Sequence, residues 1–215
     1  MARNAAGVSH VACPPVSLDL VESSVVLPGR TLAILRPRSA EALLDEEAFE
    51  REEFLPYWAE LWGSGDELSE AVAELDVAGL RIVELGCGLA LPSLAAAARG
   101  AYVLATDWSP DAIELVRGNA RRNGLELDAE IVRWSEPRAI VERAPWDLVL
   151  AADVLYERRN VDELLELLPL LGETVLLADP GRPHAKEFWA RAAGVWDVAQ
   201  DGTVYTLTAA GTSTR

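Results

Sequence analysis

The chain has 215 residues, half of them apolar, and a formal charge of −16, so it suits one globular domain with a sizeable core. The negative charge would repel phosphate groups, which disfavours RNA or DNA as a partner. It fits either a basic protein partner or a role in solubility alone. The two cysteines, Cys13 and Cys87, argue against a disulfide framework or a metal site.

The sequence shows no membrane or export signal. No apolar run approaches the roughly 20 residues that a membrane-spanning helix needs. The stretch from Met1 to Pro15 lacks the apolar core of a signal peptide. We therefore expect a cytoplasmic protein without membrane contact, and its oligomeric state stays open.

The chain divides into an N-terminal extension, residues 1–53, and a main domain, residues 54–215. We expect the extension to hold a mobile tail, a hairpin around Pro28-Gly29, and an acidic helix over Ala40–Glu53 that packs on the core. The main domain opens with the aromatic segment Phe54–Trp62.

From Leu80 onward, short apolar runs alternate with amphipathic stretches. The predicted strands are Leu80–Leu85, Ala101–Thr106, Ala129–Val132, Asp147–Ala151, Thr174–Ala178, Val195–Ala199 and Thr203–Leu207. One predicted helix follows the first strand and ends at Arg99, and a second begins at the Ser109-Pro110 cap and ends at Asn123-Gly124. Two further helices are predicted over Val161–Leu171 and His184–Ala193.

This order of elements predicts an α/β fold. Strands joined by helices imply right-handed crossovers and a mainly parallel sheet. The run Gln200-Asp201-Gly202 is a hairpin signal between the last two strands. We therefore expect a Rossmann-like, doubly wound, seven-stranded sheet with a C-terminal antiparallel hairpin strand and helices on both faces.

A glycine-rich turn follows the first strand of this sheet. Glycines let the backbone turn sharply and approach a ligand closely. A dinucleotide fingerprint counted from Gly86 would require a small residue at Leu91, which is not met. Glu84, Gly86, Gly88 and Ala90 instead fit the acidic-x-Gly-x-Gly-x-small spacing of adenosyl-cofactor enzymes.

The second strand ends at Asp107. A carboxylate in that place can accept both ribose hydroxyls of a nucleoside. The alternative is an acid near the helix N-terminus at Ser109, where it would favour the helix dipole. Because the glycine turn precedes it in a strand–helix–strand unit, we favour the ribose contact.

Four motifs lie between Phe54 and the C-terminus: Pro56–Trp62, Glu84–Ala90, the run from Asp147 to Tyr156 that ends in Asp-x-x-Tyr, and Asp179–Pro183, which reads Asp-Pro-Gly-Arg-Pro. Together they resemble the seven-strand methyltransferases, and within them the lysine methyltransferase-like group. The Asp-Pro-Gly-Arg-Pro motif resembles that of the electron-transfer-flavoprotein β-subunit lysine methyltransferases and their bacterial relatives.

The resemblance implies S-adenosyl-L-methionine as the cofactor. Related enzymes often carry an acidic residue before the adenine-contacting tryptophan, where this chain has Arg133. The cofactor contacts it implies are Trp62 at the methionine part, Glu84, Gly86, Cys87 and Gly88 at the turn, Asp107 at the ribose, Trp134 at the adenine, and Ala152 closing the pocket.

The resemblance also implies that a protein lysine is the methyl acceptor. Asp153 would orient the lysine ammonium, and Tyr156 would donate a hydrogen bond or form a pocket wall. The alternative for Asp153 is a cap on the helix that follows it. A small-molecule N-methyltransferase, or a non-catalytic cofactor-binding or interaction protein, would also fit the same scaffold. A dinucleotide-dependent oxidoreductase is disfavoured by Leu91.

Overall fold

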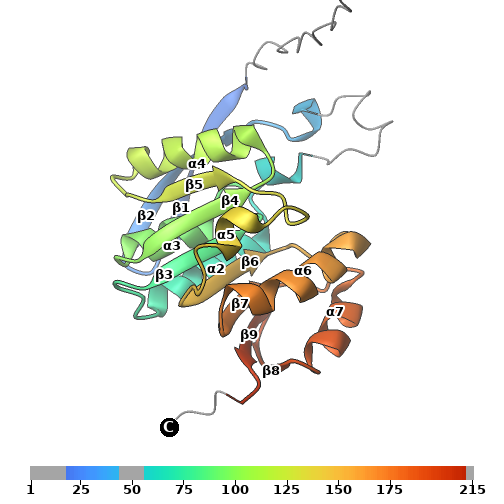
Figure 1. Ribbon diagram of the computed structural model, residues 1–215. Helices are drawn as coiled ribbons and strands as arrows, with labels where there is room; N and C mark the ends of the chain where they lie inside the picture. Colours follow the sequence, from blue (N-terminus) through green and yellow to red (C-terminus); the bar gives the residue numbers. More distant parts are fainter. Residues whose placement is uncertain (1–17, 44–55, 212–215) are drawn as a thin grey trace, which may run out of the picture.

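The computed structural model describes residues 18–43 and 56–211. It contains a seven-stranded sheet in the order β5-β4-β3-β6-β7-β9-β8 and a separate two-stranded hairpin, β1-β2 (Figure 1). The strands are β1 Leu20–Leu27, β2 Arg30–Pro37, β3 Arg81–Leu85, β4 Tyr102–Asp107, β5 Asp128–Ile131, β6 Leu148–Ala152, β7 Thr174–Ala178, β8 Trp196–Asp201 and β9 Val204–Ala209.

The strand order confirms the predicted fold class. β3 pairs in parallel with β4 on one side and with β6 on the other. The chain therefore changes direction across the sheet at β3, and such a point is where open α/β sheets bind ligands. β9 is antiparallel to both β7 and β8, which is the predicted C-terminal hairpin.

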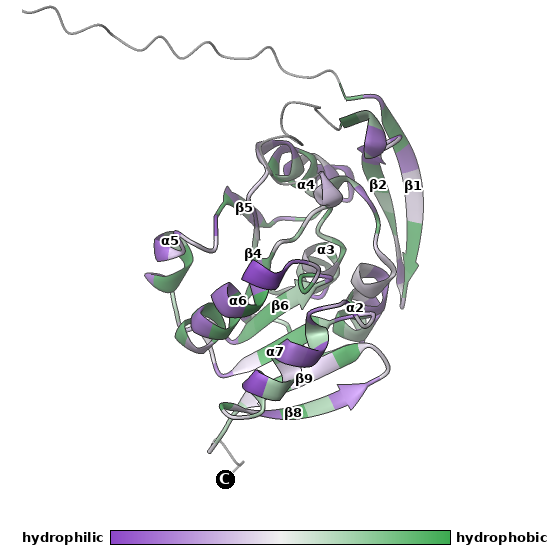
Figure 2. Ribbon diagram, turned by 90° about the vertical axis from the view of Figure 1, so that its right-hand side faces the viewer, coloured by the Kyte–Doolittle hydropathy of each residue, from purple (hydrophilic) through white to green (hydrophobic). Residues whose placement is uncertain are grey.

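Helices cover both faces of the sheet. On one face α2, α3 and α4 pack on one set of alternating strand residues, and on the other α5, α6 and α7 pack on the second set. Figure 2 shows hydrophobic colours on inner strands such as β6 and hydrophilic colours on parts of α6 and α7. The helices are α2 Gly63–Glu74, α3 Leu91–Ala98, α4 Pro110–Arg122, α5 Arg138–Val141, α6 Arg158–Leu171 and α7 Ala185–Ala192, with 3₁₀ turns η1 Glu41–Leu43 and η2 Tyr57–Ala59.

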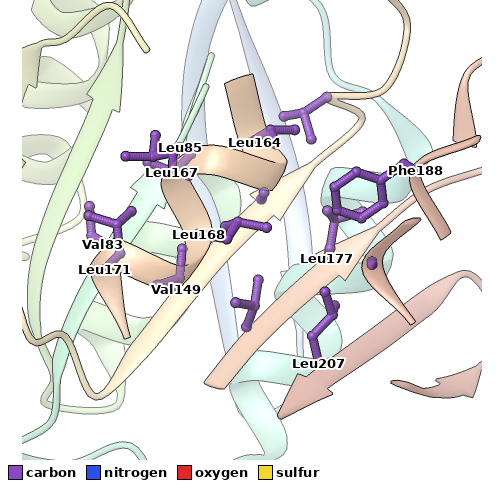
Figure 3. Close-up of a cluster of buried hydrophobic side chains, with 14 of the residues drawn as sticks. Val83, Leu85, Val149, Leu164, Leu167, Leu168, Leu171, Leu177, Phe188 and Leu207 are labelled. Carbon is purple, nitrogen blue, oxygen red and sulfur yellow. The ribbon is translucent and has the colours of Figure 1, made fainter. Parts of the chain in front are cut away.

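The core under α6 follows directly from its leucine spacing. Leucines at intervals of three and four residues form one apolar stripe on a helix. Figure 3 shows this stripe above the strands, and the side chains it labels are fully or almost fully buried. The stripe is Leu164, Leu167, Leu168 and Leu171, and the strand residues under it include Val83, Leu85, Val149 and Leu177.

The sequence did not predict α2 or the short α5. Gly63–Glu74 contains two glycines, and only four of its 12 residues are apolar, so neither helix propensity nor apolar periodicity predicts a helix there. The structure buries a narrow stripe there, formed by Leu68 and Val72 together with small serines. Of the acidic helix predicted for Ala40–Glu53, only the η1 turn lies within the described residues. The predicted tail, with Cys13, lies outside them.

The predicted hairpin at Pro28-Gly29 is confirmed, with β1 and β2 paired along their full length. Asn119 of α4 and Asn123, the C-cap residue of this helix, hydrogen-bond to the backbone of β2. Asn119 accepts from the Leu35 amide at 2.8 Å and donates to the Leu35 carbonyl at 3.0 Å. Asn123 makes the same pair of bonds with Ala33, at 2.9 Å and 2.8 Å. Within the described ranges, no helix is long and apolar enough to cross a bilayer.

Candidate active site

The carboxyl ends of β3, β4 and β6 open on a cavity of about 240 Å³. This is the edge of the sheet at which the strand order changes direction. All residues predicted for the cofactor or for catalysis line this cavity: Trp62, Glu84, Gly86, Cys87, Gly88, Asp107, Trp134, Ala152, Asp153 and Tyr156.

The glycine turn after β3 has a left-handed backbone at three positions. Gly86 has φ +62° and Gly88 has φ +52°. A Cβ on Gly86 would lie 3.1 Å from Cζ2 of Trp134, and a Cβ on Gly88 would lie 3.1 Å from the Trp58 carbonyl oxygen. Ala90 also has positive φ, at 59°, a backbone conformation that glycine adopts with less strain than alanine. The turn therefore brings bare backbone against the cavity.

Glu84 supports the turn from beneath. Its Oε2 accepts a hydrogen bond of 2.9 Å from the Ser93 amide, in the first turn of α3. The N-cap residue of this helix, Ala90, has no side chain that could do so. Burial raises the pKa of Glu84 to about 8. Glu84 thus caps a helix as well as lining the cavity.

Asp107 at the end of β4 links the turn to the next helix. Its Oδ2 accepts from the Gly88 amide at 2.9 Å, and its Oδ1 accepts from the Ser109 amide at 2.9 Å. Burial raises the pKa of Asp107 to about 6. The predicted cap of α4 is Ser109 itself, whose Oγ accepts from Ala112 at 3.3 Å. Each Asp107 oxygen keeps a second lone pair for a ligand.

Asp153 follows β6 with a left-handed backbone, φ 58°, and is 7% exposed. Its two carboxylate oxygens both bind Arg182, Oδ1 at Nε and Oδ2 at Nη2, the latter at 2.7 Å. The helix-cap alternative for Asp153 is wrong, because α6 begins later, with Glu157 as its N-cap. The Arg182 guanidinium also lies over the Trp62 ring, 5.1 Å from its centroid.

Arg182, which contacts Asp153, is the candidate site residue that sequence reasoning missed. Asp179, directly after β7, accepts the amides of Gly181 at 2.7 Å and Arg182 at 3.0 Å on its Oδ1. This tight turn directs the arginine toward Asp153. In the sequence, the run Asp-Pro-Gly-Arg supports only the family resemblance. A charged residue in a turn at the carboxyl end of a parallel strand, where open α/β sheets bind ligands, could have indicated Arg182 as a site residue.

Aromatic rings form the wall beside Asp153. The ring of Tyr57 lies 5.0 Å from that of Tyr156 and 6.2 Å from that of Trp62, edge-on in both cases. Trp62 Nε1 donates to the Tyr57 carbonyl at 2.9 Å. Burial raises the pKa of Tyr156, so its hydroxyl remains a hydrogen-bond donor at neutral pH. Arg133 and Trp134 also line the cavity.

Comparison with known proteins decides the family. The model of the lysine methyltransferase family matches residues 59–186. The chain belongs to the lysine methyltransferase family. The family region runs from the aromatic segment before α2 to the start of α7, so it includes Trp62, the glycine turn, Asp153 and Arg182.

The curated relatives that the chain matches include protein methyltransferases. The electron transfer flavoprotein beta subunit lysine methyltransferase of Xenopus laevis is 36% identical over 135 residues, 59% of this chain and 53% of the relative. Protein N-lysine methyltransferase METTL21A of Danio rerio is 33% identical over 113 residues, 49% of this chain and 51% of the relative. This chain therefore spans about half the length of the curated relatives it matches.

Solved structures share the fold of this family member. The 16S rRNA N2 G1207 methyltransferase of T. Thermophilus, in complex with AdoMet and guanosine, aligns with a TM-score of 0.64. The alignment covers 92% of this chain and 52% of that chain at 16% identity. This likeness shows that the chain has the Rossmann-like fold of that methyltransferase.

Proposed function

We propose that this chain is an S-adenosylmethionine-dependent methyltransferase that acts on a lysine side chain of a protein. One observation carries the proposal: Asp153 lines both the cavity at the glycine turn, here called the inner cavity, and a second cavity of about 420 Å³, the outer cavity. A carboxylate shared by two cavities can hold an amine that enters through the outer one against a methyl donor in the inner one.

The inner cavity fits a nucleoside with an amino-acid tail. The turn at Gly86 and Gly88 has no room for side chains, so a ligand meets backbone there. Asp107 can accept ribose hydroxyls, and the Trp134 ring offers a face for a base. When bound, S-adenosylmethionine supplies a methyl group activated by a sulfonium.

The other role of the chain is to position the acceptor nitrogen in line with the methyl donor. Holding two reactants in line can contribute on the order of 7–11 kcal/mol to the barrier reduction. Asp153 would orient the acceptor nitrogen, and the rings of Tyr57, Trp62 and Tyr156 would exclude water around it. Their mutual contacts, 5.0 Å and 6.2 Å from Tyr57, fix these rings relative to Asp153.

A protein acceptor is supported by the names of the relatives, which include two protein lysine methyltransferases. The charge of −16 favours a basic partner segment and disfavours nucleic acid. We further propose that residues 54–215 form the catalytic domain, with residues 1–53 as an extension packed on it, and that the protein acts in the cytoplasm.

The test is transfer of a tritiated methyl group from S-adenosylmethionine to a cell lysate, which is then separated into protein and small-molecule fractions. We expect the label in protein, on lysine. Asp153→Asn is expected to reduce transfer about 100-fold or more through lost orientation, with S-adenosylhomocysteine binding unchanged. Asp197→Asn, an exposed aspartate of edge strand β8, is the matched control and is expected to behave as wild type.

Other outcomes would separate the alternatives. Label confined to the small-molecule fraction would replace the protein acceptor by a small amine. Normal cofactor binding without any transfer would support a non-catalytic binding protein. Transfer by Asp153→Asn at the wild-type rate would remove Asp153 from the proposed mechanism.

A further inference from the structure

The carboxylate that would receive the acceptor is already paired with a cation. Both oxygens of Asp153 bind the Arg182 guanidinium, which is held in place by the Asp179 turn and by the Trp62 ring. The side chain of Asp153 is 7% exposed and that of Arg182 is 30% exposed. Orientation of an acceptor ammonium by Asp153 alone does not explain this arrangement.

The pair lies where the acceptor would arrive. Arg182 lines the outer cavity, while Asp153 and Trp62 line both cavities. An acceptor side chain entering from outside therefore meets the Arg182 guanidinium before the inner cavity. The outer cavity also receives Glu67 from α2 and the backbone of Gly63 at the start of that helix.

The charges around this position come from every element packed against it. Apart from Asp153 and Arg182, the charged and titratable groups around the two cavities are carboxylates, two phenols, one thiol and two further guanidiniums. They are Glu67 of α2, Asp179 after β7, Tyr57 of η2, Glu60 before α2, Glu84 of β3, Cys87 of the glycine turn, Asp107 of β4, Arg133 after β5, Tyr156 after β6, and Arg159 and Glu163 of α6.

An unpaired carboxylate would work against methyl transfer. An opposite charge within about 4–6 Å raises the pKa of an amine by about 1–3 units. The ammonium form has no lone pair and cannot attack. Lysine, with an ordinary pKa of about 10.4, is already protonated at neutral pH. A bare Asp153 would therefore bind the acceptor well but in its unreactive form.

We propose that Arg182 is a positioning residue that keeps the acceptor amine neutral at Asp153. The ion pair has no net charge, so it does not stabilise an ammonium, yet carboxylate lone pairs remain to accept an N–H bond from the neutral amine. The ammonium gives its proton to water as it enters. The nitrogen lone pair then forms the N–C bond, and the C–S bond breaks with its electrons on sulfur. This inference rests on the proposed function.

A binding experiment tests the inference without methyl transfer. n-Butylammonium is titrated by NMR at pH 7 into protein saturated with S-adenosylhomocysteine. Arg182→Met removes the charge and keeps an apolar stem over Trp62, so we expect about tenfold tighter binding of the cation, equivalent to one pKa unit. Arg182→Lys keeps the charge and is expected to resemble wild type.

Two further variants make the result decisive. Arg191→Met removes an exposed, salt-bridged arginine of α7 and is expected to bind like wild type. Arg182→Gln is the second neutral variant if Arg182→Met does not fold, and the same tighter binding is expected. Binding of n-butylammonium that is unchanged or weaker in the folded neutral variants overturns the inference.

Kinetics with the protein labelled in the lysate assay give a second readout. The pH profile of kcat reports ionisations in the bound complex. We expect Arg182→Met to move its rise toward higher pH by about one unit, with about tenfold lower kcat at pH 7 and a lower KM. A merely structural role would raise KM and leave the profile in place, which contradicts the inference. If no methyl transfer occurs in any fraction, the proposed function fails, and the binding experiment still decides the role of Arg182.

Discussion

Two aspartates at the ends of neighbouring strands have different partners. Asp107 at the end of β4 accepts hydrogen bonds from the backbone amides of Gly88 and Ser109. Asp153 after β6 is bound by a guanidinium. Amides are neutral donors and do not fully offset burial, so the pKa of Asp107 rises to about 6. Asp107 therefore changes its charge within an accessible pH range.

Cofactor affinity is expected to follow this ionisation. A ligand whose hydroxyls donate to the ionised carboxylate binds more tightly once Asp107 has lost its proton. Since the pKa of Asp107 is about 6 in the free protein, affinity for S-adenosylhomocysteine should rise from pH 5 to pH 7 and then level off. Calorimetric titration across this range measures it.

Asp107→Asn is the control for this pH dependence. It keeps the size of the side chain and an acceptor oxygen but has no proton to lose. We expect weaker binding that does not change between pH 5 and pH 7. The same slope in wild type and Asp107→Asn would show that another group controls it, and Glu84, with a pKa of about 8, titrates above this range.

At the scale of elements, α4 binds the β1-β2 hairpin through a side-chain amide that pairs with the backbone of β2 as a neighbouring strand would. Asn119, fully buried, satisfies both backbone groups of Leu35. The hairpin in turn packs Leu20 and Leu35 near Trp58, whose carbonyl contacts the turn at Gly88. This small sheet therefore packs against η2, the turn that carries both Trp58 and the cavity-lining Tyr57.

Asn119→Ala is expected to loosen the hairpin. It leaves the N–H and the carbonyl of the half-buried Leu35 without their side-chain partner, which costs about 2 kcal/mol of unfolding free energy. Chemical denaturation measures this loss, and hydrogen exchange should show faster exchange of the Leu35 amide. Arg122→Ala is the matched control on the same helix. Its ion pair with Glu22 is exposed on both sides, so an effect below about 0.5 kcal/mol is expected. Equal losses in both variants would refute the role of Asn119.

These elements also show which parts of the fold a sequence can reveal. β3 and α6 were predicted because buried strands and leucine-rich helices have strong local patterns. α2 was missed because its polar, glycine-containing sequence is helical only through packing against α3 and the sheet. The pairing of Asn119 with Leu35 joins residues 84 positions apart, which no local pattern contains.

The same distinction holds for the site. Glu84, Gly86, Gly88 and Asp107 were predicted because they belong to one strand–helix–strand unit with a regular spacing. Asp153 and Tyr156 were predicted through the family resemblance. The pairing of Asp153 with Arg182 was not predicted, because it depends on two strands, β6 and β7, ending side by side.

At the scale of the whole molecule, the acidic charge is expected to affect the binding of a protein acceptor more than that of a small amine. A charge of −16 attracts a basic segment at many points. Such surface attraction is screened over a Debye length of about 10 Å at 0.1 M salt. The acidic residues Glu60, Glu67 and Glu163 stand at the two cavities themselves.

Methyl transfer to a protein is therefore expected to depend on salt through KM. Between 50 mM and 500 mM NaCl, KM for the labelled protein should rise about threefold or more, while kcat changes little because the Asp153–Arg182 pair is largely shielded from ions. With n-butylamine, which carries one charge, KM should change much less. Steady-state kinetics at both salt concentrations measure this. A protein KM that does not respond to salt would mean that the acidic surface serves solubility and that the acceptor is recognised inside the two cavities alone.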